Sequence, residues 1–503
     1  MTRIFEVLEI GLSNFANELP KTLSLDTNCC GAWQSRRRRI RSGNRDRSKF
    51  VRYGTYAVRN QTLTIFLYIA ASAAISLFIP SVIYAAQKPT PPPEVWITVR
   101  KDGHAGKGTK ADPYDGSTHA KFDRLMASFG QNTVIHLGPG TFQTDIAARS
   151  WQPLSGWKVR GAGMEVTTIQ AVGTPIASNY AAFGKDNGNQ ANVESDNVEI
   201  SDLTVDANYS GVSVGAPRAN GESNFKCGLI TLMGSNNLVQ RVHGKNQYGS
   251  AVNGRECFGI RLAGFSDAGV VTGNRILHCL VDSPKGNYNA PYSLHGSFNT
   301  SDLMTNCEVA YCRAVGANDG LGLSTTPHTA FSSGGVNLAD VDAVKIHDNI
   351  FIDCIGLVYN DTHPANRVEI YNNFADRAFI GASYVGPSAT GWRLYNNTIS
   401  IQARNGTGAV YGLSFINVTD LRVIGNKITW SCGGPGTPSG KYGINVTGTG
   451  TVANNIIDSH LDGENISTGF TVIHGTNKTE AGNIPKGLIE SPAASRNDST
   501  VRR

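Results

Sequence analysis

A strand-and-bend pattern recurs along most of this chain and limits the folds that the chain can adopt. Each copy is a short run of alternating apolar and polar residues that leads into a bend, often at asparagine. The copies are VEISDLTVD (198–206), LVQRVHG (238–244), VVTGNRILHC (270–279), LMTNCEVAYC (303–312), VKIHDNIFIDC (344–354), VEIYNNFAD (368–376), WRLYNNTIS (392–400), LRVIGNKIT (421–429) and TVANNIID (451–458). The aligned bends are Leu203, Val242, Asn274, Cys307, Asn349, Asn373, Asn397, Asn426 and Asn455. A unit this short cannot bury its apolar face alone, so neighbouring copies must stack around a shared core.

A second short strand recurs in the intervals between these copies. Its copies are GIRL (259–262), GVNL (335–338), GLVY (356–359), GLSF (412–415) and GINV (443–446). Asparagine suits the bends because it tolerates left-handed backbone angles and its amide can bond to the next copy. Equivalent residues of stacked copies would lie about 4.8 Å apart. The pattern therefore predicts an all-β chain, a single-stranded parallel β-helix of about 10–12 coils.

Composition agrees with many short strands and tight turns, since the chain has 56 glycines and only 17% charged residues. The net charge of +6 arises at the N-terminus, where residues 1–60 carry 12 Lys/Arg and 5 Asp/Glu. The remaining chain has 33 Lys/Arg and 34 Asp/Glu. A near-neutral body argues against a basic nucleic-acid-binding surface.

The N-terminal segments indicate export. Residues 1–60 form a basic extension, either a disordered cytoplasmic tail or translated sequence upstream of the true start. The apolar run within 61–86 has the character of a signal peptide, or of a membrane anchor if it is not cleaved. The positive flank would stay inside, so that the protein becomes secreted, periplasmic or attached to the cell surface. A proline-rich linker (87–94), the β-helix domain (95–480) and a polar tail (481–503) complete the predicted organisation.

Three segments near the start of the domain carry a resemblance to a known superfamily. They are ITVRKDGHAGKGTKADPYDGSTHAKFDRLM (97–126), NTVIHLGPGTFQT (132–144) and GWKVRGAGMEVTTIQ (156–170). Together with the repeats, they resemble the opening of the pectate-lyase-like, right-handed parallel β-helix superfamily. The resemblance implies a short capping helix at Ser117–Ser128. This superfamily includes lyases, hydrolases, epimerases, phage tailspikes and adhesins, so the resemblance implies a fold and not one activity.

Two columns of side chains look reactive and have alternative interpretations. Cys279, Cys312 and Cys354 align on three copies, which favours stacked thiols that fill the interior over one activated nucleophile. His347 aligns with Tyr371 on the outward side of the next strand, in a column that Tyr395 continues. This column is either a sugar-binding strip or a solvated ladder of β-favouring side chains.

The resemblance implies that catalytic residues lie on the first sheet, which contains the GIRL strand. Outward or exit positions of this sheet include Arg261, His295, Asn337 and Asp340. The longest loops, at 244–256, 282–291 and 313–334, precede the same strand in the middle coils and would wall a cleft. We expect Asn337, Asp340 and Asp319 to bind substrate there.

The segment VYNDTHP (358–364) is the strongest local candidate for chemistry. Tyr359, Asp361 and His363 occupy alternate positions, so a carboxylate and an imidazole can face the same side. The segment resembles the Y-G-F-D-P-H signature of uronate C5-epimerases, although one residue separates Tyr from Asp here, where the signature has two, and proline follows the histidine.

These observations favour a lyase or epimerase that abstracts a proton next to the carboxylate of a uronate in an acidic polysaccharide. Arg261 would neutralise the carboxylate, and His363, His295 or Tyr359 would act as base.

Two alternatives stay open. Asp340 and Asp361 could serve as the carboxylate pair of a glycoside hydrolase, or the protein could bind glycans without catalysis. We expect a monomer that needs no cofactor, except that a calcium site built from irregular oxygen ligands would leave no motif.

Overall fold

The computed structural model describes residues 91–486, apart from 147–150, 174–178, 185–194, 209–225, 250–256, 265–268, 283–284, 287–288, 297–302, 316–334, 355, 361–362, 379, 385, 403–408, 432–439, 454–455, 462–469 and 482–483. The chain divides at Pro89 into two units, and every described residue belongs to the second. The predicted extension (1–60), the apolar segment (61–86) and the part of the predicted tail after Lys486 therefore lie outside the described residues. The start of that tail is described, because β34 ends at Ala481 and β35 spans Ile484–Lys486. Within the described part of the chain, no helix combines the length and apolar character that a membrane crossing requires.

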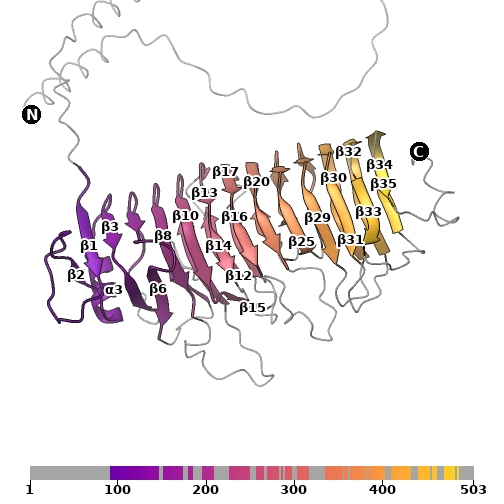
Figure 1. Ribbon diagram of the computed structural model, residues 1–503. Helices are drawn as coiled ribbons and strands as arrows, with labels where there is room; N and C mark the ends of the chain where they lie inside the picture. Colours follow the sequence, from indigo (N-terminus) through magenta and orange to yellow (C-terminus); the bar gives the residue numbers. More distant parts are fainter. Residues whose placement is uncertain are drawn as a thin grey trace, which may run out of the picture. The chain divides into compact units, whose positions relative to one another are not determined.

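The second unit is a right-handed parallel β-helix, as the repeats and the resemblance predict. Most coils contribute one strand to each of three sheets, and the strands of successive coils lie side by side from the indigo to the yellow end in Figure 1. One short contact departs from this rule, because Tyr248 pairs with Cys227 in antiparallel orientation.

The first sheet contains the second recurring strand. Its members are β7 (Asn179–Phe183), β9 (Lys226–Met233), β12 (Cys257–Ala263), β16 (Asn289–His295), β19 (Val336–Ala339), β22 (Val358–Asn360), β26 (Ala382–Tyr384) and the first parts of β30 (Ala409–Ile424), β32 (Gly440–Ala453) and β34 (Phe470–Ala481).

The second sheet begins with the entry segments and continues through the main repeat. Its members are β1 (Glu94–Thr98), β3 (Val134–Leu137), β5 (Lys158–Arg160), β8 (Glu199–Asp206), β10 (Leu238–Lys245), β13 (Arg275–Leu277), β17 (Met304–Ala310), β20 (Val341–His347), β24 (Glu369–Tyr371), β28 (Arg393–Tyr395) and the later parts of β30, β32 and β34.

The third sheet follows the asparagine bend. Its members are β4 (Gly140–Asp145), β6 (Thr167–Val172), the later parts of β8 and β10, β14 (Leu280–Asp282), β18 (Arg313–Val315), β21 (Ile350–Ile352), β25 (Phe374–Ala378), β29 (Thr398–Gln402), β31 (Lys427–Ser431), β33 (Ile456–Leu461) and β35 (Ile484–Lys486). Five two-residue strands, β2 (Tyr114–Asp115), β11 (Tyr248–Gly249), β15 (Lys285–Gly286), β23 (Ala365–Asn366) and β27 (Ala389–Thr390), lie at the bends and loops.

The core is a stack of apolar columns inside the coil. One column of the second sheet consists of Ile200, Val239, Ile276, Val309, Ile346, Ile370, Leu394, Val423 and Val452, all fully buried. The alternation places Lys345 outward between buried Val344 and Ile346. Each coil buries its apolar face on the next, so the hydrophobic effect acts along the whole stack.

A helix covers the open end of the first coil, as the resemblance implied. The helix α3 (His119–Ser128) begins after Thr118, whose hydroxyl accepts a hydrogen bond from the Lys121 backbone N–H at 3.3 Å. Phe122 is fully buried and packs its ring 5.2 Å from that of Phe142. The buried Asp123 carboxylate accepts hydrogen bonds from Thr144 Oγ1, the Asp145 N–H and Trp151 Nε1, each at 2.8 Å. The helix thus shields the exposed edge that the first coil would otherwise present.

An asparagine ladder joins the second and third sheets. The side-chain oxygens of Asn373, Asn397 and Asn426 each accept the backbone N–H of the ladder residue one coil earlier, at 3.0 to 3.1 Å. Each amide also donates to a carbonyl of the preceding coil, as from Asn373 Nδ2 to Ile346 O at 2.9 Å. These asparagines are at most 2% exposed. The ladder therefore satisfies backbone groups that the bend would otherwise leave unpaired inside the protein.

The predicted alignment of the ladder is wrong at two positions. The column of Asn349 contains Cys312 and Cys279, and Asn274 and Cys307 lie at the preceding bend. Two similar bends lie five residues apart in each coil, and both start with a residue in the left-handed region, such as Asp348 (φ 55°). The residue in the left-handed region therefore lies one position before the ladder asparagine. The sequence had led us to expect the left-handed conformation at the asparagine itself.

The thiols continue the asparagine ladder toward the N-terminus. The Cys279 N–H donates to Cys312 Sγ at 3.4 Å, and the Cys312 thiol donates to Ile276 O at 3.5 Å. Asn373 likewise accepts a backbone N–H from the bend one coil earlier and donates to a carbonyl of that coil. Cys354, however, does not stack on Cys312, because Cys312 shares its bend with Asn349. Burial raises the pKa of the Cys307 thiol to about 12 and raises that of Cys312, so these cysteines are structural, as predicted.

Replacing Asn373 by alanine should lower the free energy of unfolding by about 2–3 kcal/mol, because the Asn349 N–H and the Ile346 carbonyl lose their partner inside the protein. Asn366 is a matched control, since its side chain accepts the Thr390 N–H at an exposed site, where water can replace it. Urea denaturation should show a loss below about 1 kcal/mol for Asn366→Ala. Equal losses for the two variants would contradict a special role for the buried ladder.

The contacts of the Cys312 thiol predict that the protein tolerates asparagine at position 312. Cys312→Asn should keep the stability of the wild type within about 1 kcal/mol, because an amide can accept from Cys279 and donate to Ile276. Cys312→Ala should lose about 1–3 kcal/mol, because it removes both contacts. Thermal and urea unfolding of the two variants would test this, and an asparagine variant as unstable as the alanine variant would refute the equivalence.

Candidate functional site on the first sheet

A row of polar side chains lies on the outward side of the first sheet, one from each strand. Strand register aligns Thr231, Arg261, Ser293, Asn337, Tyr359, Ser383, Ser414 and Asn445. The residues on either side of this row, such as Leu262 and Leu294, face the core. Every residue of the row is at most 8% exposed, whereas Lys345 on the outward side of the second sheet is exposed. Charges in this row are therefore poorly screened, which strengthens their interactions.

Arg261 and His295 form the centre of the site. Arg261 lies on β12, and its Nη2 is 3.5 Å from His295 Nδ1 on β16. The other ring nitrogen, His295 Nε2, is 2.5 Å from Asn337 Oδ1 on β19. These contacts link three successive strands and order a cation, an imidazole and an amide on one face. The sequence analysis predicted all three residues for this face, and the structure brings them together.

The aromatic ring of Phe258 supports this centre. The Arg261 guanidinium carbon lies 4.9 Å from the centre of the Phe258 ring, a cation–π distance. The Phe258 ring also meets the His295 ring edge to face, with 4.6 Å between centroids and 67° between planes. Phe258 was not predicted for the site, because a phenylalanine in a strand is an ordinary core residue and its ring contact with His295 comes from the neighbouring coil.

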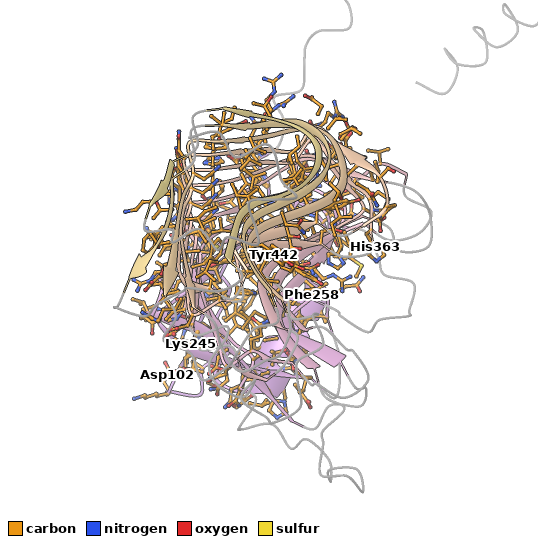
Figure 2. The ribbon with its side chains drawn as sticks, turned by 90° about the vertical axis from the view of Figure 1, so that its right-hand side faces the viewer. Asp102, Lys245, Phe258, His363 and Tyr442 are labelled. Carbon is orange, nitrogen blue, oxygen red and sulfur yellow. The ribbon has the colours of Figure 1, made fainter. Side chains whose placement is uncertain are left out.

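His363 pairs with Asp340 at the end of the same sheet. His363 Nδ1 lies 3.0 Å from Asp340 Oδ2, and the side chains are 33% and 10% exposed. Asp340 lies at the bend after β19, in the left-handed region (φ 51°), and His363 follows β22. The carboxylate beside this imidazole therefore comes from the preceding coil. In Figure 2, His363 and Phe258 lie toward the right-hand side of the view, away from Lys245.

Of the other residues predicted for the site, Tyr359 is described by the structure and two carboxylates are not. Tyr359 is buried in the outward row, directly beside Asn337. It reaches this position because GLVY is displaced by one residue relative to GVNL, with Val358 opposite Val336. Asp361 and Asp319 lie outside the described residues, as does most of the three loops that were expected to wall a cleft. The predicted cleft and the roles of these two carboxylates stay predictions.

This arrangement has the parts of a general acid/base site. A carboxylate only accepts hydrogen bonds, so Asp340 holds the N–H of His363 on Nδ1 and leaves the basic lone pair on Nε2. The Arg261 guanidinium, held on Phe258, supplies a fixed positive charge on the same face. Within the described residues, no cluster of three or more His, Cys, Asp or Glu side chains could hold a metal ion.

The aromatic column on the other face is better explained as structural. Within the column, the rings of His347 and Tyr371 stack at 4.6 Å and those of Tyr371 and Tyr395 at 5.8 Å. At the neighbouring bend, the rings of His278 and Tyr311 stack at 4.8 Å. A ring stacked on another ring cannot offer that face to a sugar. His347 was expected to face solvent, but it is only 6% exposed, because Asp348 and Glu308 also bind its two nitrogens at 2.7 and 2.9 Å.

A charged cluster near the third sheet also has a structural explanation. Glu165, in the left-handed region (φ 66°), binds Lys245 Nζ at 2.6 Å and contacts His243 Nδ1. The hydrogen bond from Lys245, followed by that from His243, lowers the pKa of Glu165 to about 2 despite partial desolvation. Lys245 and His243 thus clamp the loop before β6 onto β10.

Comparisons with known proteins show a likeness of fold. Neither a protein-family profile nor a curated protein sequence matches the chain. Among solved structures, the A-module of a mannuronan C-5 epimerase from Azotobacter vinelandii matches with 14% identity, 74% of this chain, 94% of that chain and a TM-score of 0.31. Endopolygalacturonase I from Stereum purpureum matches with 11% identity, 71% and 96% coverage and a TM-score of 0.39. A mannuronic acid-specific family 6 polysaccharide lyase from human gut microbiota matches with 12% identity, 72% and 79% coverage and a TM-score of 0.37.

Proposed function

We propose that this protein is a carbohydrate-active enzyme that abstracts a proton next to the carboxylate of a uronate residue in an acidic polysaccharide. The observation that carries the proposal is the His363–Asp340 pair on the face that also bears the Arg261 guanidinium. Lyase and epimerase reactions share this first step, and both need a base together with a positive charge that stabilises the carbanion-like transition state.

The proposed roles follow from the chemistry of each side chain. Arg261 binds the uronate carboxylate and neutralises its charge, which makes the neighbouring C–H more acidic. His363 removes the proton through Nε2, and Asp340 stabilises the imidazolium that forms. Asn337 on β19 and Tyr359 on β22 are neighbours in the outward row and would bind sugar hydroxyls. Substrate would therefore lie across β12, β16, β19 and β22.

Hydrolysis by the same fold is less well supported. An inverting or retaining hydrolase needs two carboxylates on opposite sides of the glycosidic bond, about 5 to 9.5 Å apart. The described strands β12, β16, β19 and β22 contain no carboxylate, and Asp340 at the end of β19 is already bound to His363. Asp361, the expected second carboxylate, lies outside the described residues.

Export also belongs to the proposal. The basic residues before position 60 and the apolar run within 61–86 have the pattern of a secretion signal or anchor. A polysaccharide substrate would be met outside the cytoplasm, in agreement with that pattern. The free thiols of Cys279, Cys307, Cys312 and Cys354 are compatible with an oxidising compartment because all four are buried.

The proposal predicts activity on polyuronates that depends on His363. The purified protein should form unsaturated uronate ends on alginate or polygalacturonate, or should incorporate deuterium at C5 in heavy water without cleavage. His363→Ala should lower this rate by at least about 100-fold, the usual contribution of a general base. The matched control is His278→Ala, which replaces an exposed histidine at the bend beside the aromatic column and should keep full activity.

Three results would contradict the proposal in different ways. New reducing ends without unsaturation or deuterium would indicate a hydrolase. Glycan binding without any reaction would indicate a binding protein. Unsaturated products from an Asp361→Asn/His363→Ala double variant would keep the activity but refute the assigned base.

A further inference from the structure

The contacts of His295 determine where its proton lies. An arginine guanidinium has only N–H donors and no acceptor. Since Arg261 Nη2 lies 3.5 Å from His295 Nδ1, that nitrogen must carry the lone pair. A neutral imidazole then has its N–H on Nε2, where Asn337 Oδ1 accepts it at 2.5 Å. The two contacts, made to different strands, require the same tautomer.

The charged form of His295 does not fit this environment. Protonation of Nδ1 would turn an N–H toward the N–H groups of Arg261 and place a second cation 3.5 Å from the first. His295 is 1% exposed and Arg261 is 6% exposed, so little water is present to screen the repulsion. Phe258 contacts both side chains and keeps them in this geometry.

The two histidines of the site are therefore held in opposite tautomers. His363 carries its N–H on Nδ1, toward the Asp340 carboxylate, and has its lone pair on Nε2. His295 carries its N–H on Nε2 and uses its lone pair to hold Arg261. The Asp340 carboxylate beside His363 stabilises the protonated form that a base must adopt, whereas the Arg261 cation beside His295 opposes it.

We infer that His295 is not the base but a neutral positioning residue, which together with Asn337 and Phe258 fixes the Arg261 guanidinium for an anionic group of the substrate. The tautomer follows from the contacts alone, and the role of Arg261 toward a uronate rests on the proposed function. This inference separates two histidines that the sequence analysis treated as equivalent candidates.

Neutron diffraction from the wild-type protein at neutral pD tests the tautomer directly. We expect a deuteron on His295 Nε2 and none on Nδ1. A deuteron on Nδ1, or on both nitrogens, would overturn the inference. This measurement needs no substrate, so it gives an answer even if the protein has no activity on polyuronates.

Two substitutions of His295 test its role. In His295→Gln, the amide oxygen can accept from Arg261 and the amide nitrogen can donate to Asn337, so the neutral contacts persist without a titratable group. We expect this variant to keep kcat within about tenfold of the wild type, whereas a lost base would cost about 100-fold or more. His295→Leu has a similar size and makes neither contact, and it should raise KM because Arg261 is no longer held.

The outcomes separate the explanations. A His295→Gln variant as inactive as His363→Ala would identify His295 as a base and refute the inference. Equal KM values for the Gln and Leu variants would show that His295 does not position Arg261. A third result is possible, in which neither the wild type nor any variant acts on polyuronates but the neutron map shows the N–H of His295 on Nε2. The proposed function would then fail, and the positioning of Arg261 by His295 would stand.

Discussion

Backbone hydrogen bonding between successive coils is the constraint on which the rest of the structure depends. Each coil has an open edge above and below, so its N–H and C=O groups are satisfied only if the next coil repeats its path in register. The Asn349–Asn426 ladder and the Cys279–Cys312 pair satisfy the groups at the bend, where the strands cannot. Because the register is kept, side chains that are 22 to 42 residues apart in sequence stand next to each other on one face.

The same constraint accounts for the position of the site. Arg261, His295 and Asn337 come from three strands whose order along the first sheet is their order in sequence, and Asp340 follows the third of them. A rigid sheet fixes their spacing at about 4.8 Å per strand. The outward row is buried, although the corresponding side of the second sheet holds exposed residues such as Lys345. A buried cation beside an imidazole and an amide is costly unless each contact is well formed, which explains the ring of Phe258 beneath Arg261.

The fold was largely predictable from the sequence, but the finer register was not. Alternation and a recurring bend identify stacked strands, since both depend only on the period of the chain. The alignment failed at Asn274 and Cys307 because each coil has two bends of the same geometry, five residues apart, and asparagine occurs at both. Cysteine at position 312 stands in for asparagine, a substitution that residue type alone does not suggest. Phe258 and the pairing of His363 with Asp340 depend on side-chain contacts between coils, which a repeat pattern does not contain.

The central claim is that the outward side of the first sheet binds an acidic sugar through Arg261. A crystal structure of the His363→Ala variant with a uronate oligosaccharide tests it most directly. We expect a sugar carboxylate bound to the Arg261 guanidinium, with the oligosaccharide lying over Asn337 and Tyr359. An oligosaccharide bound instead along the column of His347, Tyr371 and Tyr395 would contradict it.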